Sequence, residues 1–140
     1  MHKKRILVID DEPSVARVIS LALSAANIEH VLDHCADGAQ GRIKAAHGEY
    51  DLIALDLAMP LMDGVTALAE MKQNPKSAPI PVVVITGTQD PALQQQVMDL
   101  GAAALIAKPF QVQDITNTFT RVLAGERVES GQGGIRPLGT

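Results

Sequence analysis

The sequence predicts an α/β fold in which five helices cover a doubly wound, five-stranded parallel sheet. Short apolar runs recur along the chain without polar alternation, which is typical of strands buried on both faces of a sheet. Segments with helical periodicity lie between these runs, as in chains that alternate strands with crossover helices. The 140 residues, 46% of them hydrophobic, suffice for one domain with its own core.

The strands are predicted from five apolar runs, each of strand length rather than helix length. The clear runs cover residues 6–9, 52–55, 82–85 and 105–107. A weaker candidate lies around Val31-Leu32.

The helices are predicted from apolar side chains spaced three and four residues apart. Pro13 suits the first position of a helix whose apolar face is formed by Val15, Val18, Ile19 and Ala22. The Asp90-Pro91 pair predicts the cap and first turn of a later helix, and Gly101 suits its end. A last helix is indicated by Ile115, Phe119 and Val122. Weaker helical patterns cover 38–47 and 64–73.

Composition excludes several functions. The net charge is −4 and the chain has one Tyr, two Phe and no Trp, so it offers neither a basic surface for phosphates nor rings for base stacking. We therefore expect no nucleic acid to bind. Cys35 is the single cysteine, which rules out an internal disulfide and a cysteine-rich zinc site and fits a reducing cytoplasm. No apolar stretch approaches the roughly 18 residues of a membrane span.

The end of the chain is rich in glycine. Residues 125–140 follow the last predicted helix, and we expect them to form a flexible tail or the start of a linker. The predicted domain therefore spans residues 3–124.

Polar residues follow each clear apolar run. They are Asp10, Asp11, Asp56, Thr86 and Lys108. In an open parallel sheet the carboxyl ends of the strands share one edge, where ligands bind. We therefore expect these side chains to converge in one pocket.

Such a pocket predicts phosphoryl chemistry. Three carboxylates in close contact repel one another, and their hard oxygens suit Mg²⁺ or Mn²⁺, which commonly pair carboxylates with a phosphate. Asp56 can then act as a nucleophile that forms an aspartyl phosphate. Lys108 and the cation would neutralise the phosphoryl oxygens, and Thr86 would donate a hydrogen bond to one of them.

The motifs, taken together, resemble the receiver domain of two-component response regulators, and the chain is similar to the family's single-domain chemotaxis members. The resemblance covers about residues 3–124. It rests on Asp10-Asp11, Asp56-Leu57-Ala58-Met59-Pro60 through Asp63-Gly64, Thr86-Gly87 and Lys108-Pro109-Phe110. It implies a flavodoxin-like sheet with strand order 2-1-3-4-5 and a cis peptide bond before Pro109.

The resemblance also implies roles for the site residues. Asp56 would accept a phosphoryl group from the phosphohistidine of a sensor kinase or a phosphotransfer protein. Mg²⁺ would be bound by Asp11, Asp56 and the backbone carbonyl of Ala58, with Asp10 acting through water. The protein would be a bacterial cytoplasmic switch that catalyses its own phosphorylation and dephosphorylation, not a metabolic enzyme. Its partners would include a downstream protein effector, and it would not bind a membrane. A weak homodimer is compatible with the family.

One position departs from the family pattern. The aromatic residue usually found three positions before the lysine is replaced by Leu105, which has neither ring nor hydroxyl to present at the face of the fourth helix, fifth strand and fifth helix. Signalling through Thr86 and that face is therefore expected to differ from the usual aromatic switch.

Other interpretations remain at this point. The chain could be a degenerate receiver that acts as a protein-interaction module without phosphorylation. Asp10-Asp11 could simply cap the helix after Pro13. An aspartate-based phosphohydrolase would need a second acid two positions after Asp56, where the chain has Ala58.

Overall fold

The computed structural model describes residues 3–58, 63–131 and 134–137. The Met59-Pro60 part of the motif after Asp56 lies outside these residues.

The predicted sheet and its strand order are confirmed. The strands are β1 (Lys4–Ile9), β2 (His30–Cys35), β3 (Leu52–Leu55), β4 (Val82–Thr86) and β5 (Ala104–Ala107). They pair in parallel in the order β2-β1-β3-β4-β5. β2, the weakest in sequence, is an edge strand whose residues are mostly only partly buried, which explains its poor apolar signal.

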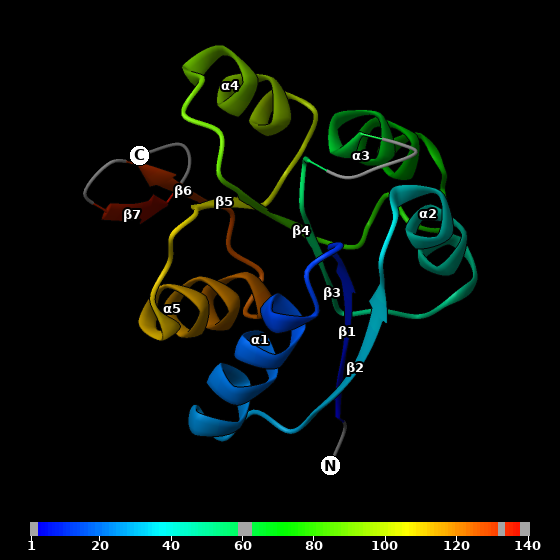
Figure 1. Ribbon diagram of the computed structural model, residues 1–140. Coiled ribbons are helices and arrows are strands. Elements are labelled where there is room, and N and C mark those ends of the chain that lie inside the picture. The colour runs from blue at the N-terminus through cyan, green and yellow to red at the C-terminus, as the bar shows by residue number, and fades with distance from the viewer. Residues whose placement is uncertain (1–2, 59–62, 132–133, 138–140) are drawn as a thin grey trace.

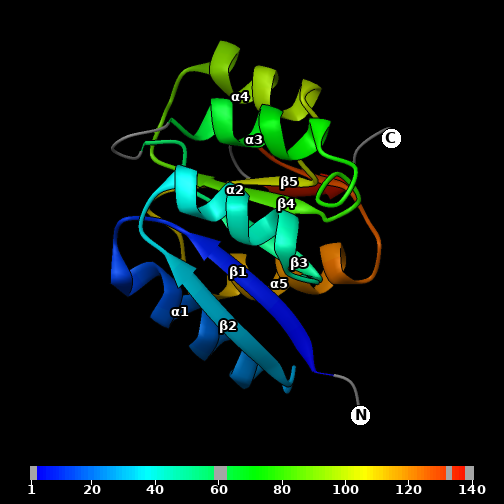
Figure 2. The ribbon, with the colours of Figure 1, turned by 90° about the vertical axis from the view of Figure 1, so that its right-hand side faces the viewer.

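Two layers of helices cover the sheet (Figures 1 and 2). One face carries α1 (Pro13–Ala25) and α5 (Val112–Leu123), and the other carries α2 (Gly38–His47), α3 (Gly64–Gln73) and α4 (Pro91–Asp99). The two weakly predicted helices, 38–47 and 64–73, have the expected bounds. Each layer encloses an aliphatic core, and Phe119 lies fully buried in the one beneath α1 and α5.

Three helix starts are capped by an aspartate side chain. Asp37, Asp63 and Asp90 cap α2, α3 and α4 by accepting hydrogen bonds from backbone amides two or three residues later. In α1 the cap residue is Glu12, which makes no side-chain capping bond. The acidic pair Asp10-Asp11 is therefore not a helix cap.

The register of the strands places the predicted site residues. Ile9 at the end of β1 is opposite Leu55 of β3, so that Asp10 and Asp56 leave the sheet side by side. Thr86 ends β4 opposite Ala107 of β5, directly before Lys108. The parallel pairing thus brings the polar residues to one edge.

The prediction of a flexible tail is not met by residues 126–128, which contact the rest of the domain. Arg127 donates hydrogen bonds to backbone carbonyls of the core domain, and Val128 is fully buried. Two short strands, β6 (Val128–Gly131) and β7 (Gly134–Pro137), then form an antiparallel pair. A single valine among glycine and polar residues has no periodicity, so the sequence pattern did not indicate this contact. The predicted domain end at residue 124 stays a prediction.

Among the described residues, no helix has the length and apolar character needed to cross a membrane.

The buried ring of Phe119 should dominate the stability of the α1–α5 layer. We expect Phe119→Ala to lower the free energy of unfolding by about 3–5 kcal/mol, because it removes buried contacts and leaves a cavity. Val112→Ala in the same helix is the matched control, since Val112 is exposed, and it should cost about 0.5 kcal/mol or less. Urea unfolding measures both, and equal losses would contradict this view of the core.

Candidate functional site

Three carboxylates meet at the carboxyl edge of the sheet. Asp10 and Asp11 follow β1, and Asp56 follows β3. Carboxylate oxygens of all three lie within 4.8 Å of one another. Asp10 and Asp56 are buried, with exposed fractions of 1% and 4%, whereas Asp11 is exposed. The predicted convergence of these residues is thus present.

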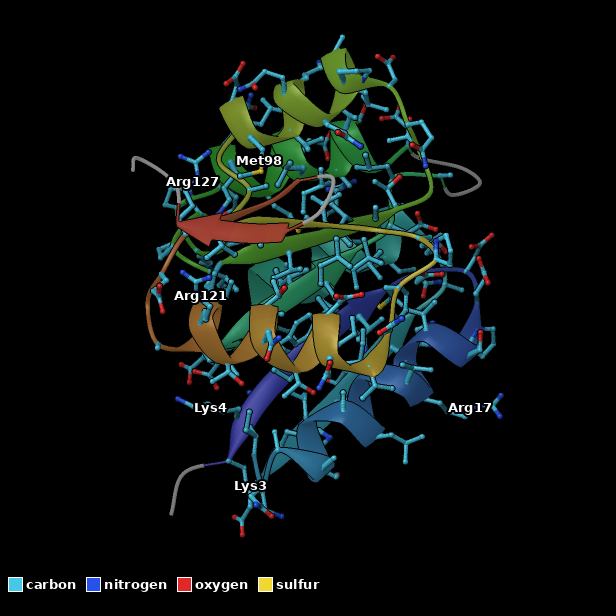
Figure 3. The ribbon with its side chains drawn as sticks, turned by 90° about the vertical axis from the view of Figure 1, so that its left-hand side faces the viewer. Lys3, Lys4, Arg17, Met98, Arg121 and Arg127 are labelled. Atoms are coloured by element: carbon cyan, nitrogen blue, oxygen red, sulfur yellow. The ribbon has the colours of Figure 1, made fainter. Side chains whose placement is uncertain are left out.

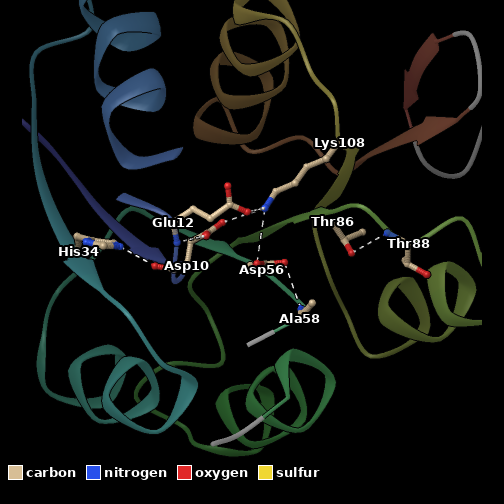
Figure 4. A network of polar contacts seen from close by, with 8 residues as sticks. All are labelled: Asp10, Glu12, His34, Asp56, Ala58, Thr86, Thr88 and Lys108. Carbon is tan, nitrogen blue, oxygen red and sulfur yellow. Dashed lines mark hydrogen bonds and ion pairs between the residues drawn. The ribbon is translucent and has the colours of Figure 1, made fainter. Parts of the chain in front are cut away.

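The ammonium group of Lys108 lies among the carboxylates of Asp10, Asp56 and Glu12 (Figure 4). Its Nζ is 3.4 Å from Asp10 Oδ2, 3.6 Å from Asp56 Oδ2 and 3.4 Å from Glu12 Oε1. Lys108 begins the loop after β5, and its bond to Pro109 is cis, as the resemblance implied. A single cation is therefore shared among carboxylates from two strand ends.

Backbone groups hold the two buried carboxylates in place. The Glu12 amide donates to Asp10 Oδ1 over 2.8 Å, and the Ala58 amide donates to Asp56 Oδ1 over 3.2 Å. In both cases Oδ2 is the oxygen that faces Lys108. Each carboxylate is thus oriented by one oxygen and presents the other to the pocket.

The start of α3 approaches the Asp56 loop closely. The Gly64 amide donates to the carbonyl of Leu57 over 2.9 Å. A β-carbon at Gly64 would overlap the backbone of Asp56 and Leu57. Glycine is therefore required here by proximity, which gives Asp63-Gly64 a role beyond the helix-entry turn.

Burial raises the pKa of both buried acids. Burial is the main cause for Asp56, opposed by the hydrogen bond from the Ala58 amide and the charge of Lys108. Burial likewise raises the pKa of Asp10, against the hydrogen bond from the Glu12 amide, and the charge of Asp56 adds to it. The pocket therefore disfavours two carboxylates in their charged form, and a bound cation would relieve this cost.

The acids around Lys108 raise the pKa of its ammonium group. Burial by itself would lower the pKa of its ammonium group, but the charges of Asp10, Asp56 and Glu12 outweigh burial and raise it. Lys108 is thus held in its cationic form, as required of a group that neutralises oxygen charge.

Thr86 connects the site to α4. Its hydroxyl is buried and accepts a hydrogen bond from the Thr88 amide over 3.2 Å. Its carbonyl accepts from the Lys108 amide over 2.8 Å. Thr86 therefore lies where the loop to α4 and the loop carrying Lys108 meet.

Leu105 faces the other way from the pocket. It is 4% exposed and belongs to the buried cluster that includes Val97 and Met98 of α4. The position of the missing aromatic residue is thus filled by a core side chain.

Two contacts of the site were not predicted. Glu12 pairs with Lys108. The sequence could have indicated this residue, because it is the third of three consecutive acids before Pro13. His34 Nε2 donates to the carbonyl of Asp10 over 2.6 Å. That contact depends on the register of β1 with β2, where Val8 is opposite His34, and no local pattern could indicate it.

The fold and the site define a class of protein, one with a doubly wound parallel sheet that carries an acidic cluster and a lysine at its carboxyl edge. The family model of the response regulator receiver domain matches residues 6–120. The chain belongs to this family.

Known proteins agree with this assignment. The chain is 33% identical over 111 residues to the DNA-binding dual master transcriptional regulator RpaA of Synechocystis, covering 79% of this chain but 45% of that protein. Among solved structures, it is similar to the chemotaxis response regulator CheY4 of Vibrio cholerae, with 26% identity, a TM-score of 0.76, and 86% and 99% of the two chains covered. It is also similar to the phosphorylated cyanobacterial phytochrome response regulator RcpA, with 28% identity, a TM-score of 0.70, and 89% and 91% covered.

The raised pKa of Asp10 predicts a pH-dependent gain in stability for Asp10→Asn. Because the folded protein holds the proton more tightly than the unfolded chain, wild type loses stability as the pH rises from the unfolded value of 3.8 through the raised folded pKa. Without divalent metal, Asp10→Asn should thus be more stable than wild type at neutral pH and gain nothing below pH 3.8.

Urea unfolding in the presence of a chelator measures this difference. Glu49→Gln, at an exposed acid outside the site, controls for the change in net charge and should show no such gain. A less stable Asp10→Asn at neutral pH would contradict the electrostatic account of the pocket.

Proposed function

We propose that Asp56 is the phosphoacceptor of this receiver domain. The observation that carries the proposal is the position of its carboxylate. It is buried, it is oriented through Oδ1 by the Ala58 amide, and Oδ2 faces the Lys108 ammonium at 3.6 Å. Asp11, by contrast, is exposed.

The reaction is a phosphoryl transfer from a phosphohistidine of a sensor kinase or phosphotransfer protein. An Asp56 oxygen attacks phosphorus, the phosphorus–nitrogen bond breaks, and the imidazole nitrogen leaves with the electron pair. Lys108 neutralises charge on the phosphoryl oxygens, and Thr86 donates a hydrogen bond to one of them. Attack of water on the acyl phosphate would reverse the modification, so that the domain acts as a self-limiting switch.

The acidic site fits Mg²⁺. Its donors are carboxylate oxygens within 4.8 Å of one another, and burial raises the pKa of two of the acids. Asp11, Asp56 and the Ala58 carbonyl would hold the ion, with Asp10 acting through water. Bound there, Mg²⁺ would supply positive charge to the phosphoryl group.

The surroundings of the site suit a protein donor. A groove beside it is lined by residues of α1 and of the loop after β5, including Val15, Val18, Lys108, Phe110 and Val112. It combines apolar side chains with the catalytic lysine, as expected of a surface on which a phosphohistidine-bearing helix docks. RcpA, which has the same fold, has been crystallised in a phosphorylated form, which supports the same chemistry here.

The output is proposed to be a protein contact in the cytoplasm. The chain spans about half the length of the relatives it matches, and the net charge of −4 favours a protein effector over nucleic acid for this part. The free thiol of Cys35 suits a reducing compartment. A weak homodimer is a further form that the family permits.

A second candidate is a receiver that only binds partners. Leu105 favours it, because this buried side chain lacks the ring through which receivers usually signal. The complete set of Asp56, Thr86 and Lys108 favours phosphorylation, and the first experiment below separates the two.

Phosphorylation of Asp56 is testable by mass spectrometry. Incubation with Mg²⁺ and a small acyl phosphate should add one phosphoryl group to the peptide containing Asp56. Asp56→Asn should gain none, and Lys108→Ala should react at least about tenfold more slowly because charge neutralisation is lost. An unmodified wild type, or equal modification of Asp56→Asn, would favour the interaction module.

Binding of Mg²⁺ should stabilise the folded protein. At a Mg²⁺ concentration about 100 times its dissociation constant, the expected gain in the free energy of unfolding is about 2.7 kcal/mol. Asp11→Asn should lose most of the gain, whereas Glu49→Gln should keep it. Thermal unfolding with and without Mg²⁺ measures this, and an Asp11→Asn variant that responds like wild type would exclude Asp11 as a ligand.

A further inference from the structure

The chain turns back on itself directly after α5. Gly125 adopts a φ of +93°, a left-handed conformation that favours glycine. The Glu126 amide then donates to the carbonyl of Arg121 over 3.0 Å, and Arg121 Nη2 contacts Glu126 Oε1 at 3.0 Å. We call residues 125–128 the C-terminal latch, because this turn directs them toward the end of α4.

Arg127 joins the latch to α4. Its Nε donates to the carbonyl of Ala102 over 2.9 Å, and its Nη2 donates to the carbonyl of Met98 in the last turn of α4. Figure 3 shows Arg127 beside Met98, and Arg121 lies below them on α5. Carbonyls at a helix C-terminus lack partners within the helix and favour a cation. Arg127 is thus a cap for α4 supplied by the far end of the chain.

Val128 joins the latch to the sheet. Its amide donates to the carbonyl of Ala103 over 2.6 Å, and its side chain lies fully buried in the cluster that contains Phe119 and Val122 of α5. Together with Arg127, it bridges α5 to α4 past the start of β5. The latch therefore lies on the face where receivers of this family usually signal.

The other end of α4 is connected to the phosphorylation site. The Thr86 hydroxyl accepts from the Thr88 amide, and the Thr88 carbonyl accepts from Gln94 Nε2 over 3.1 Å. Asp90 caps the helix by accepting from the Ala92 amide. A shift of the Thr86 hydroxyl toward Asp56 would withdraw the acceptor of the Thr88 amide. The start of α4 would then move, and a helix this short moves as one unit.

We propose that the C-terminal latch is the output element of this domain: phosphorylation of Asp56 moves α4 and releases Arg127 and Val128. The inference rests on the proposed function. In it, the latch reports the phosphorylation state to a partner, which Leu105 cannot do because it lacks an aromatic ring. Release exposes the carbonyls of Met98 and Ala102 and the start of β5 to a protein effector.

Linkage makes the coupling reciprocal. If phosphorylation weakens the latch, then weakening the latch must favour the phosphorylated form by the same factor. Arg127→Ala should thus bind Mg²⁺ with beryllium fluoride, a mimic of the phosphoryl group, about threefold or more tightly than wild type. Arg42→Ala removes an exposed arginine that pairs with Glu70, far along the chain from the latch, and should bind like wild type.

Amide exchange observed by NMR tests the forward direction. In wild type, Mg²⁺ with beryllium fluoride should accelerate exchange of the Val128 amide about fivefold or more, while amides at the centre of β3 stay protected. Asp56→Asn should show no acceleration. If Arg127→Ala does not fold, Arg127→Lys replaces it, because lysine keeps the charge but lacks the planar fork of donors.

Two results would overturn the inference, and they differ. If mass spectrometry shows that Asp56 is phosphorylated but Val128 exchange is unchanged and Arg127→Ala binds like Arg42→Ala, the latch is structural only. If neither wild type nor Arg127→Ala is modified at Asp56, the proposed function fails and the latch has no phosphorylated state to report.

Discussion

The site depends on one ammonium group shared among three carboxylates. Lys108 lies within 3.6 Å of Asp10, Asp56 and Glu12, and two of these acids are buried. Burial is the main cause of the raised pKa values of Asp10 and Asp56, and the charge of Lys108 offsets it only in part. The parallel register of β1 with β3 enforces the crowding, so the fold itself maintains a site that gains by binding positive charge.

The crowded acids of the site also bear on the proposed phosphorylation of Asp56. A phosphoryl group on Asp56 adds negative charge and oxygen acceptors to a pocket that already has an excess of both. In the proposed reaction, the Lys108 ammonium, 3.6 Å from Asp56, and the Thr86 hydroxyl would respond to that charge. Thr86 is also the residue whose hydroxyl accepts from the loop to α4. In this proposal, a Thr86 hydroxyl that turns to the phosphoryl group can no longer accept from the Thr88 amide, so compensation of charge at the site would accompany movement of α4.

Sequence predicted the parts of this protein that depend on local pattern. Apolar runs located β1 and β3–β5, and residues at their ends, such as Asp56 and Lys108, marked the site because parallel strands share an edge. The pattern did not reveal the His34 contact to Asp10, which depends on the pairing of β2 with β1. Nor did it reveal Arg127 and Val128, since contacts between a chain end and a helix 29 positions earlier have no local signal.

Both ends of α4 are closed by local hydrogen bonds, and its C-terminal end has an additional contact with a separate segment, which is the contact that the proposed release would break. Its start is held by nearby residues, with Asp90 and Gln94 bonded within the same loop and helix. Its end is closed by the amides of Leu100, Gly101 and Ala102, which donate to carbonyls of α4. Arg127, an exposed side chain from a separate segment, adds a contact there. Hydrogen bonds to charged groups contribute about 1.5–3 kcal/mol, and less where water competes. Coupling energies between sites are typically about 1–3 kcal/mol, so a contact of this size can be formed or lost with the state of Asp56 while the core, built on Phe119 and the sheet, stays intact.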